Sequence, residues 1–376
     1  MLTSPAPPSS LLLLRSVLAH SAERRAAAAT DEQTPWTRMR RWCWYVMPAL
    51  MIGTVTIMFY ASNLKVPWMF WTATQTATSP SNQSHHNIAT TVQFISTEAP
   101  SIYHVAYPHP YHMVVDEPHR CGDESPFLVL MIPVAPHNRE ARDTIRNTWV
   151  KETNVLGRVV SHFFLTALSN GTEPTPEQLL QESQRHHDIL QSDFLDSYNN
   201  LTIKTMVMFE WLSSHCTNAS YAMKIDSDMF LNVHNLVDML LKAPAHLYLT
   251  GEVPRSAAVI RDPNSKWFLP FSVYPESTYP PYALGLGYVF SLDLPPKIVE
   301  ASAHVKPVYI EDVTVGLCMR HLGIALSDPP HGYFFRGLVP QSPGNCYWNS
   351  VITTIMENSN RISQAWEIYQ RYKDGC

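Results

Sequence analysis

The sequence contains three short, predominantly apolar runs that are separated by segments of helical character. They are PFLVLMIPV at 126–134, VVSHFFLTAL at 159–168 and YAMKI at 221–225. Apolar runs of this length, without strict polar alternation, are typical of strands that are buried on both faces of a sheet. Because helical segments lie between them, the sequence predicts an α/β fold with a mostly parallel central sheet flanked by helices.

Helical patterns fill the intervals between these runs. Ile145 and Trp149 lie one turn apart after the first run, and a Thr-Pro-Glu start at 175–177 opens a second helix. Apolar residues recur at three- and four-residue steps over 198–212, which indicates an amphipathic helix. Ligands of such folds gather at the carboxyl ends of strands. The residues directly after 225 are therefore expected at the functional end of the sheet.

The run at 42–61 (WCWYVMPALMIGTVTIMFYA) contains no charged residue and has about the length that crosses a bilayer core. A signal peptide and a buried core helix are also apolar, but this run begins too late and is too long for a signal peptide. Arginines precede it at 38, 40 and 41, whereas only Lys65 follows it closely. The positive-inside rule therefore predicts a signal-anchor helix with a cytoplasmic N-terminus and a lumenal remainder.

Composition divides the rest of the chain. Residues 1–41, rich in Ala, Ser, Pro and Leu, are expected to form a disordered cytoplasmic tail. Residues 62–120 are dominated by Thr, Ser, Pro, His and Asn without periodicity, which predicts a lumenal stem. The globular domain is then expected at 121–376. A formal net charge of -5 supplies no general attraction to nucleic acid.

Two further features agree with a lumenal location. Asn-x-Ser/Thr sequons follow the expected span, at Asn82, Asn170, Asn200 and Asn218. The six cysteines form no Cys-x-x-Cys pair and no zinc-type spacing, so disulfides are favoured over metal thiolates. Five of them lie after the span, and this odd number leaves one thiol over or predicts an intermolecular bridge: Cys121, Cys216, Cys318, Cys346 and Cys376. Their pairing is open.

The main candidate for chemistry is Asp226-Ser227-Asp228. Two carboxylates separated by one residue can present oxygen ligands to Mn²⁺ or Mg²⁺. An EF-hand loop is excluded, because its sixth position would be Leu231 rather than glycine. A turn closed by a helix-capping aspartate stays open as an alternative.

Arg142 and Arg146 lie four residues apart on one helix face and could receive phosphate or uracil oxygens. A solvated basic face, or salt bridges to Glu140 and Asp143, would explain them at least as well.

Gly285 and Gly287 precede a short apolar strand, where glycine permits a sugar to approach the backbone or simply forms a turn or bulge. Glu311-Asp312 follows an apolar VYI segment at 308–310. A carboxylate there is a candidate general base or, alternatively, a helix cap.

Several ordered motifs carry a resemblance. They are R142-x3-R146-x2-W149, H187-D188-I189-L190, D193-F194-x-D196-x-Y198-x2-L201-T202-x-K204-T205, K224-x-D226-S227-D228-M229-F230-x-N232, Y282-x2-G285-x-G287-Y288-x2-S291 and E311-D312-V313-x2-G316-x-C318. This set resembles the animal β1,3-galactosyltransferase family and extends over essentially the whole globular part. The string SKWFLP...YPESTYPPY is similar to galactosyl-transferring members.

The resemblance implies a GT-A-like fold and a catalytic domain at 121–376. It implies UDP-galactose as donor, a GlcNAc-type glycan as acceptor, Mn²⁺ or Mg²⁺ as cofactor, inversion at the anomeric carbon and a single-pass type II protein of the Golgi membrane. A homodimer is left open. The alternatives are N-acetylglucosaminyl transfer from UDP-GlcNAc to galactose-terminated acceptors and a lumenal glycan-binding protein without catalysis.

The resemblance also implies roles for individual residues. Asp226 and Asp228 would hold the metal, and Asp312 would be the base with Glu311 as its neighbour. The donor site would be formed by Lys224, Asp226, Ser227, Asp228, Arg142, Arg146, Gly285 and Gly287.

The chain departs from the family pattern at two places. It reads Ala-Leu-Gly-Leu-Gly-Tyr at 283–288, where relatives usually have Cys-Ser-Gly-x-Gly-Tyr, and Ile355 stands after 351–354, where many relatives carry a histidine. If that histidine is a metal ligand in relatives, this chain binds the metal through fewer protein groups or through another residue such as His331.

Overall fold

The computed structural model describes residues 101–171 and 174–376. The strands are β1 Met113–Val115, β2 Leu128–Pro133, β3 Asn154–Val155, β4 Arg158–Leu168, β5 Ile189–Leu195, β6 Tyr221–Ile225, β7 Met229–Leu231, β8 Leu249–Gly251, β9 Gly287–Ser291, β10 Phe335–Arg336 and β11 Thr353–Ile355. The helices are α3 Arg120–Glu124, α4 Arg139–Asn147, α5 Pro176–His186, α6 Leu201–His215, α7 Val233–Leu240, α8 Leu294–Ser302, α9 Glu311–His321, α10 Tyr347–Ser350 and α11 Ser359–Tyr372. Short 3₁₀ turns lie at η1 Trp149–Lys151 and η2 Tyr198–Asn200.

The main sheet has the strand order β1-β5-β4-β2-β6-β9-β8, and β3 pairs with β4. Its centre, β5-β4-β2-β6, is parallel, as the sequence predicts. The outer strands β1, β9 and β8 pair in antiparallel fashion, so the sheet is mixed rather than mostly parallel. The expected α/β architecture is present, and the antiparallel strands correct the expected strand directions at both edges.

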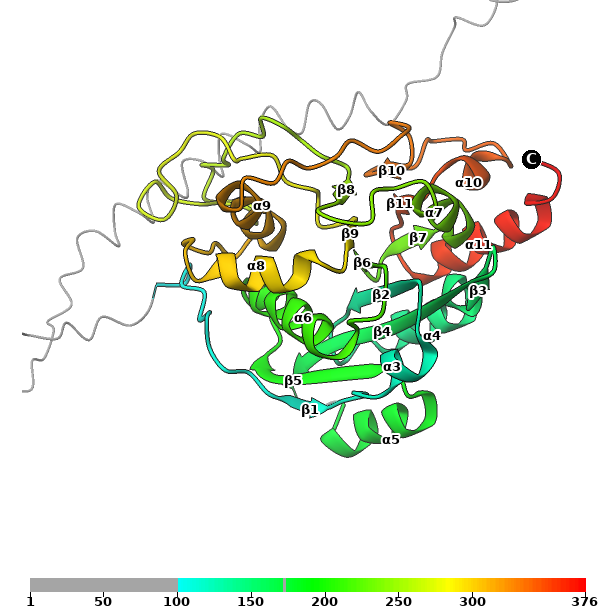
Figure 1. Cartoon of the computed structure of the whole chain (residues 1–376), viewed down its shortest axis with the longest axis horizontal. Helices are drawn as coiled ribbons and strands as arrows, with labels where there is room; N and C mark the ends of the chain where they lie inside the picture. Colours follow the sequence, from blue (N-terminus) through cyan, green and yellow to red (C-terminus); the bar gives the residue numbers. More distant parts are fainter. Residues whose placement is uncertain (1–100, 172–173) are drawn as a thin grey trace, which may run out of the picture. The chain divides into compact units, whose positions relative to one another are not determined.

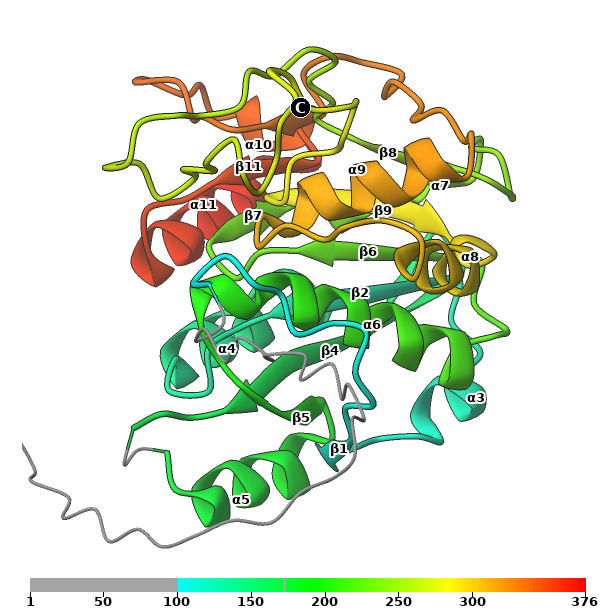
Figure 2. The same ribbon diagram turned by 90° about the vertical axis from the view of Figure 1, so that its left-hand side faces the viewer.

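Alternate residues of β2 enter two different hydrophobic cores. Val129 and Met131 pack on the face covered by α6, α8 and α9. Leu130 and Ile132 pack on the opposite face, against α4, α7 and α11. Figures 1 and 2 show helices on both faces of the sheet. This two-sided burial explains why the strand at 126–134 lacks polar alternation.

The helix expected over 198–212 differs from the structure in two respects. Tyr198 lies in the 3₁₀ turn η2, and α6 begins at Leu201. Every residue from Thr202 to Phe209 is buried, so α6 is enclosed rather than amphipathic. Its second face is covered by α8 and α9, which the apolar periodicity of α6 did not reveal.

The folded domain extends before Cys121, which differs from the expected stem boundary at residue 120. Val105 and Tyr107 are 4% and 7% exposed and belong to the core on the α6 side. The Tyr107 hydroxyl donates a hydrogen bond to Glu210 Oε1 (2.6 Å), and β1 pairs with β5. The low apolar content of this segment concealed these contacts.

A second sheet of three strands, β10-β11-β7, lies next to the main one. In it, β7 pairs antiparallel with β11, so Met229 faces Ile355. The helix α11 packs beside β7, and Trp366 and Tyr369 enter the same core. The sequence patterns indicated none of these C-terminal elements.

Two disulfides, Cys121–Cys216 and Cys346–Cys376, join distant segments. Cys318 is a free thiol and is buried in α9. The expectation of one unpaired thiol after residue 61 is confirmed.

The expected membrane span at 42–61 lies outside the described residues, as do the tail at 1–41, the stem up to residue 100 and Asn82. Within 101–171 and 174–376, no helix is both long and apolar enough to cross a bilayer.

The sequons differ in accessibility, which predicts unequal glycosylation. Asn170 and Asn218 are exposed. Asn200 is half-buried, its amide nitrogen donates to the Leu195 carbonyl (2.8 Å), and Thr202 of its sequon is buried. We therefore expect higher glycan occupancy at Asn170 and Asn218 than at Asn200 when the chain is secreted, as measured by glycopeptide mass spectrometry. Equal occupancy at all three sites would contradict this expectation.

Candidate active site

The acidic pair lies where the two sheets meet. The fully buried strand β6 pairs with β2 on one side and β9 on the other, and it ends at Ile225. Asp226 and Ser227 are half-buried, and Asp228 is exposed. The chain then enters β7 of the second sheet. The predicted position of the pair at the carboxyl end of a buried strand is confirmed.

Lys224 is the buried cation of the site. Its ammonium group donates to Asp226 Oδ1 (2.7 Å), to Glu311 Oε1 (2.8 Å) and to the carbonyl of Gly285. Burial alone would lower the pKa of Lys224. The carboxylates of Asp226 and Glu311 raise this pKa by more than burial lowers it, so it lies above its ordinary value. Lys224 therefore stays charged and fixes Asp226 relative to Glu311.

Glu311 and Asp312 form the first turn of α9 and play different structural roles. Besides Lys224, the Glu311 carboxylate accepts hydrogen bonds from Thr205 (3.2 Å) and Tyr288 (3.3 Å). Glu311 is thus buried and fully engaged. Glu311, which the sequence analysis expected beside a catalytic base, therefore anchors Lys224.

Asp312 is held only by backbone groups. Its Oδ2 accepts from the Gly285 N–H (2.9 Å), and its Oδ1 accepts from the Val313 N–H (2.8 Å). Burial, together with the charge of Glu311, raises the pKa of Asp312 to about 7. A carboxylate with such a pKa can accept a proton efficiently near neutral pH.

Gly285 joins the two acidic segments. Its carbonyl accepts from Lys224, while its N–H donates to Asp312. A Cβ atom at this position would lie 2.6 Å from Glu311 Oε1 and 3.5 Å from Asp312 Oδ2. Close approach to these carboxylates therefore requires glycine here. Gly287, the first residue of β9, would place a Cβ 3.1 Å from Met223 Cε.

The acidic pair fits a divalent cation that has few protein ligands. The pKa of Asp228 lies above its ordinary value, because surrounding atoms limit its hydration and Asp226 lies nearby. A cation would offset this concentrated negative charge. Within the described ranges, no three His, Cys, Asp or Glu side chains form a metal-binding group. Two carboxylates with substrate phosphate oxygens and water are a common coordination of Mg²⁺.

His331, the candidate substitute ligand, stacks on Tyr333 (5.3 Å between ring centroids) and packs against Phe334 (4.9 Å). It forms no such three-residue group with the acidic pair.

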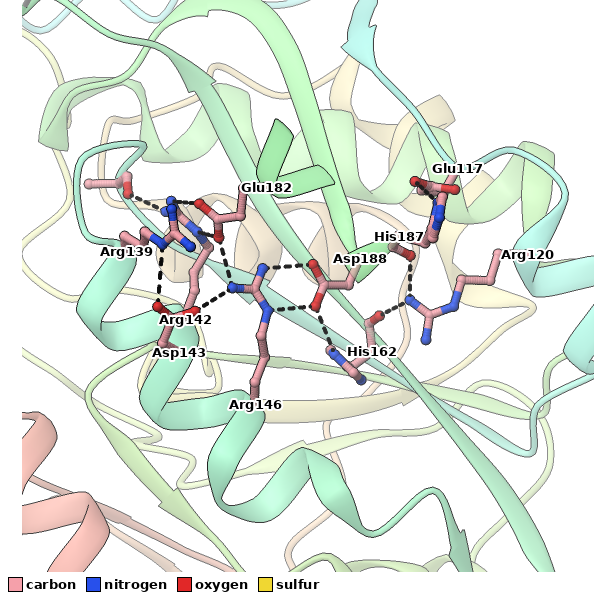
Figure 3. Close-up of polar contacts among 11 residues, drawn as sticks. Glu117, Arg120, Arg139, Arg142, Asp143, Arg146, His162, Glu182, His187 and Asp188 are labelled. Carbon is pink, nitrogen blue, oxygen red and sulfur yellow. Dashed lines mark hydrogen bonds and ion pairs between the residues drawn. The ribbon is translucent and has the colours of Figure 1, made fainter. Parts of the chain in front are cut away.

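Arg142 and Arg146 are engaged by carboxylates of their own, as Figure 3 shows. Arg142 is 1% exposed and donates two hydrogen bonds to Glu182 (2.7 and 2.8 Å). Arg146 donates two to Asp188 (both 2.8 Å) and further ones to Glu182 and Asp143 (each 2.8 Å). The sequence analysis expected both arginines to contact phosphate or uracil oxygens, whereas in the structure they contact carboxylates. Of the two alternative salt bridges, the structure contains the one to Asp143.

Three residues to which the sequence analysis gave no role complete the site. Thr205 and Tyr288 hold Glu311, and Tyr282 lies near Asp312, whose charge adds to burial in raising the pKa of Tyr282 to about 12. All three occur in the quoted motifs, which was the available signal.

The sequence matches the domain family described as Galactosyltransferase over residues 140–330. The chain belongs to the galactosyltransferase family. β1,3-Galactosyltransferase 2 of Pongo abelii is 38% identical to this galactosyltransferase over 284 residues, covering 73% of this chain and 67% of the relative. β1,3-Galactosyltransferase 1 of Mus musculus is 43% identical over 221 residues, which cover 58% of this chain and 67% of the relative. The resemblance inferred from the motifs is thereby confirmed.

Among solved structures, the WbbM bifunctional glycosyltransferase aligns with this galactosyltransferase at a TM-score of 0.36 and 11% identity, covering 65% of this chain and 52% of that one. This similarity is too low to inform the assignment.

Proposed function

We propose that this galactosyltransferase moves galactose from UDP-galactose to the 3-hydroxyl of a GlcNAc-terminated glycan, with inversion at the anomeric carbon. The position and raised pKa of Asp312 at the start of α9 are the observation that carries the proposal. The β1,3-galactosyltransferase names of the relatives support galactose as the transferred sugar and the β1,3 linkage.

In the proposed mechanism, Asp312 accepts the proton of the acceptor 3-hydroxyl while that oxygen attacks the anomeric carbon of galactose. The bond to the UDP oxygen breaks in the same displacement, and UDP leaves. Gly285 and Val313 hold the carboxylate of Asp312 in place. Mn²⁺ or Mg²⁺ held by Asp226 and Asp228 would supply positive charge to the diphosphate. Lys224 and Glu311 orient Asp226.

Side-by-side assays with purified lumenal protein test this proposal. UDP-galactose and UDP-GlcNAc are each offered to GlcNAc-terminated and galactose-terminated acceptors, and the linkage of the product is determined by NMR. We expect galactose in β1,3 linkage to GlcNAc. Preferred transfer of GlcNAc would establish the alternative donor, and glycan binding without any transfer would establish the non-catalytic alternative.

Replacement of Asp228 by asparagine is expected to weaken Mn²⁺-dependent UDP binding about tenfold or more, because one of two carboxylate ligands loses its charge. The measurement is a UDP titration with and without Mn²⁺. Asp238→Asn is the matched control, since Asp238 is a half-buried aspartate of α7 that pairs with Lys242. If Asp228→Asn titrates like Asp238→Asn, Asp228 only forms the turn after β6.

We also propose that the protein resides in the Golgi membrane with its catalytic domain in the lumen. The exposed sequons and the two disulfides are compatible with that compartment. Glycosidase sensitivity of the full-length chain in intact and permeabilised vesicles tests the orientation. Protease access to the catalytic domain in intact vesicles would overturn it.

A further inference from the structure

Three exposed side chains gather close to the acidic site. Trp267 is 46% exposed and Tyr198 is 44% exposed. The ammonium group of Lys266 lies 4.5 Å from the Trp267 ring centroid and 5.7 Å from that of Tyr198. We call Tyr198, Lys266 and Trp267 the aromatic platform. Single exposed aromatic residues are ordinary on a protein surface, but two rings that share one cation need a further explanation.

The platform lies within electrostatic range of the candidate base. Partial burial raises the pKa of Tyr198, and the charges of Asp312, Asp226 and Glu311 raise it further. Tyr198 also directly precedes α6, the helix whose Thr205 holds Glu311. The platform and the carboxylates therefore border one site.

A specific contact fixes Trp267 relative to the helix that carries the base. The hydroxyl of Tyr309 lies 2.8 Å from the carbonyl oxygen of Lys266 and 3.0 Å from that of Phe268, the two residues that flank Trp267. Tyr309 is only two residues before Glu311, and its ring lies 6.2 Å from that of Tyr198. Tyr309 therefore connects the start of α9 to the residues on both sides of Trp267 and to the ring of Tyr198.

The loop that carries Trp267 is held in place independently. The guanidinium group of Arg261 donates to the carbonyl oxygens of Leu269, Tyr274 (2.8 Å) and Glu276 (2.7 Å). A loop with such backbone anchors presents its exposed ring in one position. A surface of this kind binds a ligand with little cost in loop ordering.

We propose that the aromatic platform is the acceptor subsite, in which Trp267 and Tyr198 pack against the C–H face of the sugar whose hydroxyl proton passes to Asp312. The inference rests on the proposed function. An aromatic ring carries negative charge on its face, which suits the weakly positive C–H groups of a pyranose. Lys266 supplies hydrogen-bond donors for the sugar hydroxyls at the same place. An apolar surface with a few converging polar groups is the usual composition of a small-ligand site.

Kinetics of Trp267→Ala test the proposal, with Trp267→Phe and Tyr198→Ala as companion variants. We expect Trp267→Ala to raise the acceptor KM about tenfold, whereas the Kd of UDP stays within about twofold. Trp267→Phe is expected to retain most acceptor affinity, because a ring remains. Phe271→Ala is the matched control, since Phe271 is a 65% exposed aromatic residue of the same loop that packs against Arg261.

The proposal is overturned if Trp267→Ala changes the acceptor KM no more than Phe271→Ala does, or if donor and acceptor binding weaken equally. Thermal unfolding shows whether each variant folds. If Trp267→Ala does not fold, the acceptor KM values of Trp267→Phe and Tyr198→Ala are compared with that of Phe271→Ala instead. If the wild-type protein transfers no sugar, the proposed function fails, and titration with a GlcNAc-terminated oligosaccharide followed by NMR tests the platform separately. Binding that Trp267→Ala weakens supports the subsite, and absent or unaffected binding overturns it.

Discussion

Replacement of Asp312 by asparagine is expected to lower the transfer rate about 10²- to 10⁴-fold, the usual cost of removing a positioned base. The amide has nearly the same size, and its single oxygen can still accept one of the two hydrogen bonds that Gly285 and Val313 donate. UDP and Mn²⁺ binding should therefore persist. Initial rates with saturating donor, together with a UDP titration, provide the measurement. Asp238→Asn is again the control, and wild-type turnover in Asp312→Asn would remove Asp312 from the mechanism.

The pH dependence gives a second signature of the same residue. The base works only when it is ionised, so the rate of the wild-type protein should rise with pH through about 7. The folded protein binds this proton more tightly than the unfolded chain, whose aspartate has a pKa of 3.8. The contribution of Asp312 to the free energy of unfolding therefore falls as pH rises from about 4 to about 7.

Asp312→Asn lacks this proton-linked contribution, so its free energy of unfolding should fall less than that of the wild type as pH rises from about 4 to about 7. Lost activity with preserved stability would distinguish a chemical role from misfolding. An equal fall of the free energy of unfolding with pH in the wild type and in Asp312→Asn would contradict the raised pKa of Asp312.

Replacement of Glu182 by alanine is expected to reduce the free energy of unfolding by about 3–5 kcal/mol, the range for removing one partner of a buried ion pair. Glu182 is 4% exposed and receives hydrogen bonds from both Arg142 and Arg146 (Figure 3). Without it, Arg142 would be a buried cation whose remaining partner is the carbonyl of Ala135. The pKa of Glu182 lies below its ordinary value, because the two guanidinium groups outweigh its burial.

Urea unfolding monitored by circular dichroism measures this effect. Glu177→Ala is the matched control, since Glu177 is an exposed glutamate in the first turn of the same helix, α5. Glu182→Gln keeps the shape and one acceptor oxygen, so it should be less harmful than Glu182→Ala. Equal stability of Glu182→Ala and Glu177→Ala would show that the ion pairs contribute little to folding.

The sequence alone determined the framework of the site. The apolar runs that became β2, β4 and β6 could be identified because strands buried on both faces leave a local signature. The same signature placed Asp226 at the carboxyl end of β6, and the motifs identified the galactosyltransferase family. The helix start at α5 was also local, because a Thr-Pro start acts within one turn.

Only the tertiary structure decided which groups face one another. Lys224 and Glu311 are 87 residues apart in the chain, and Arg142 and Glu182 are 40 apart. Neither pairing has a local sequence signal, because helix and strand periodicity reports the buried side of an element and not its partner. Gly285 could likewise be explained as a turn until Lys224, Glu311 and Asp312 were found around it. The sequence could predict the parts of the site that depend on a single helix or strand. The contacts between residues of distant elements could be identified only in the tertiary structure.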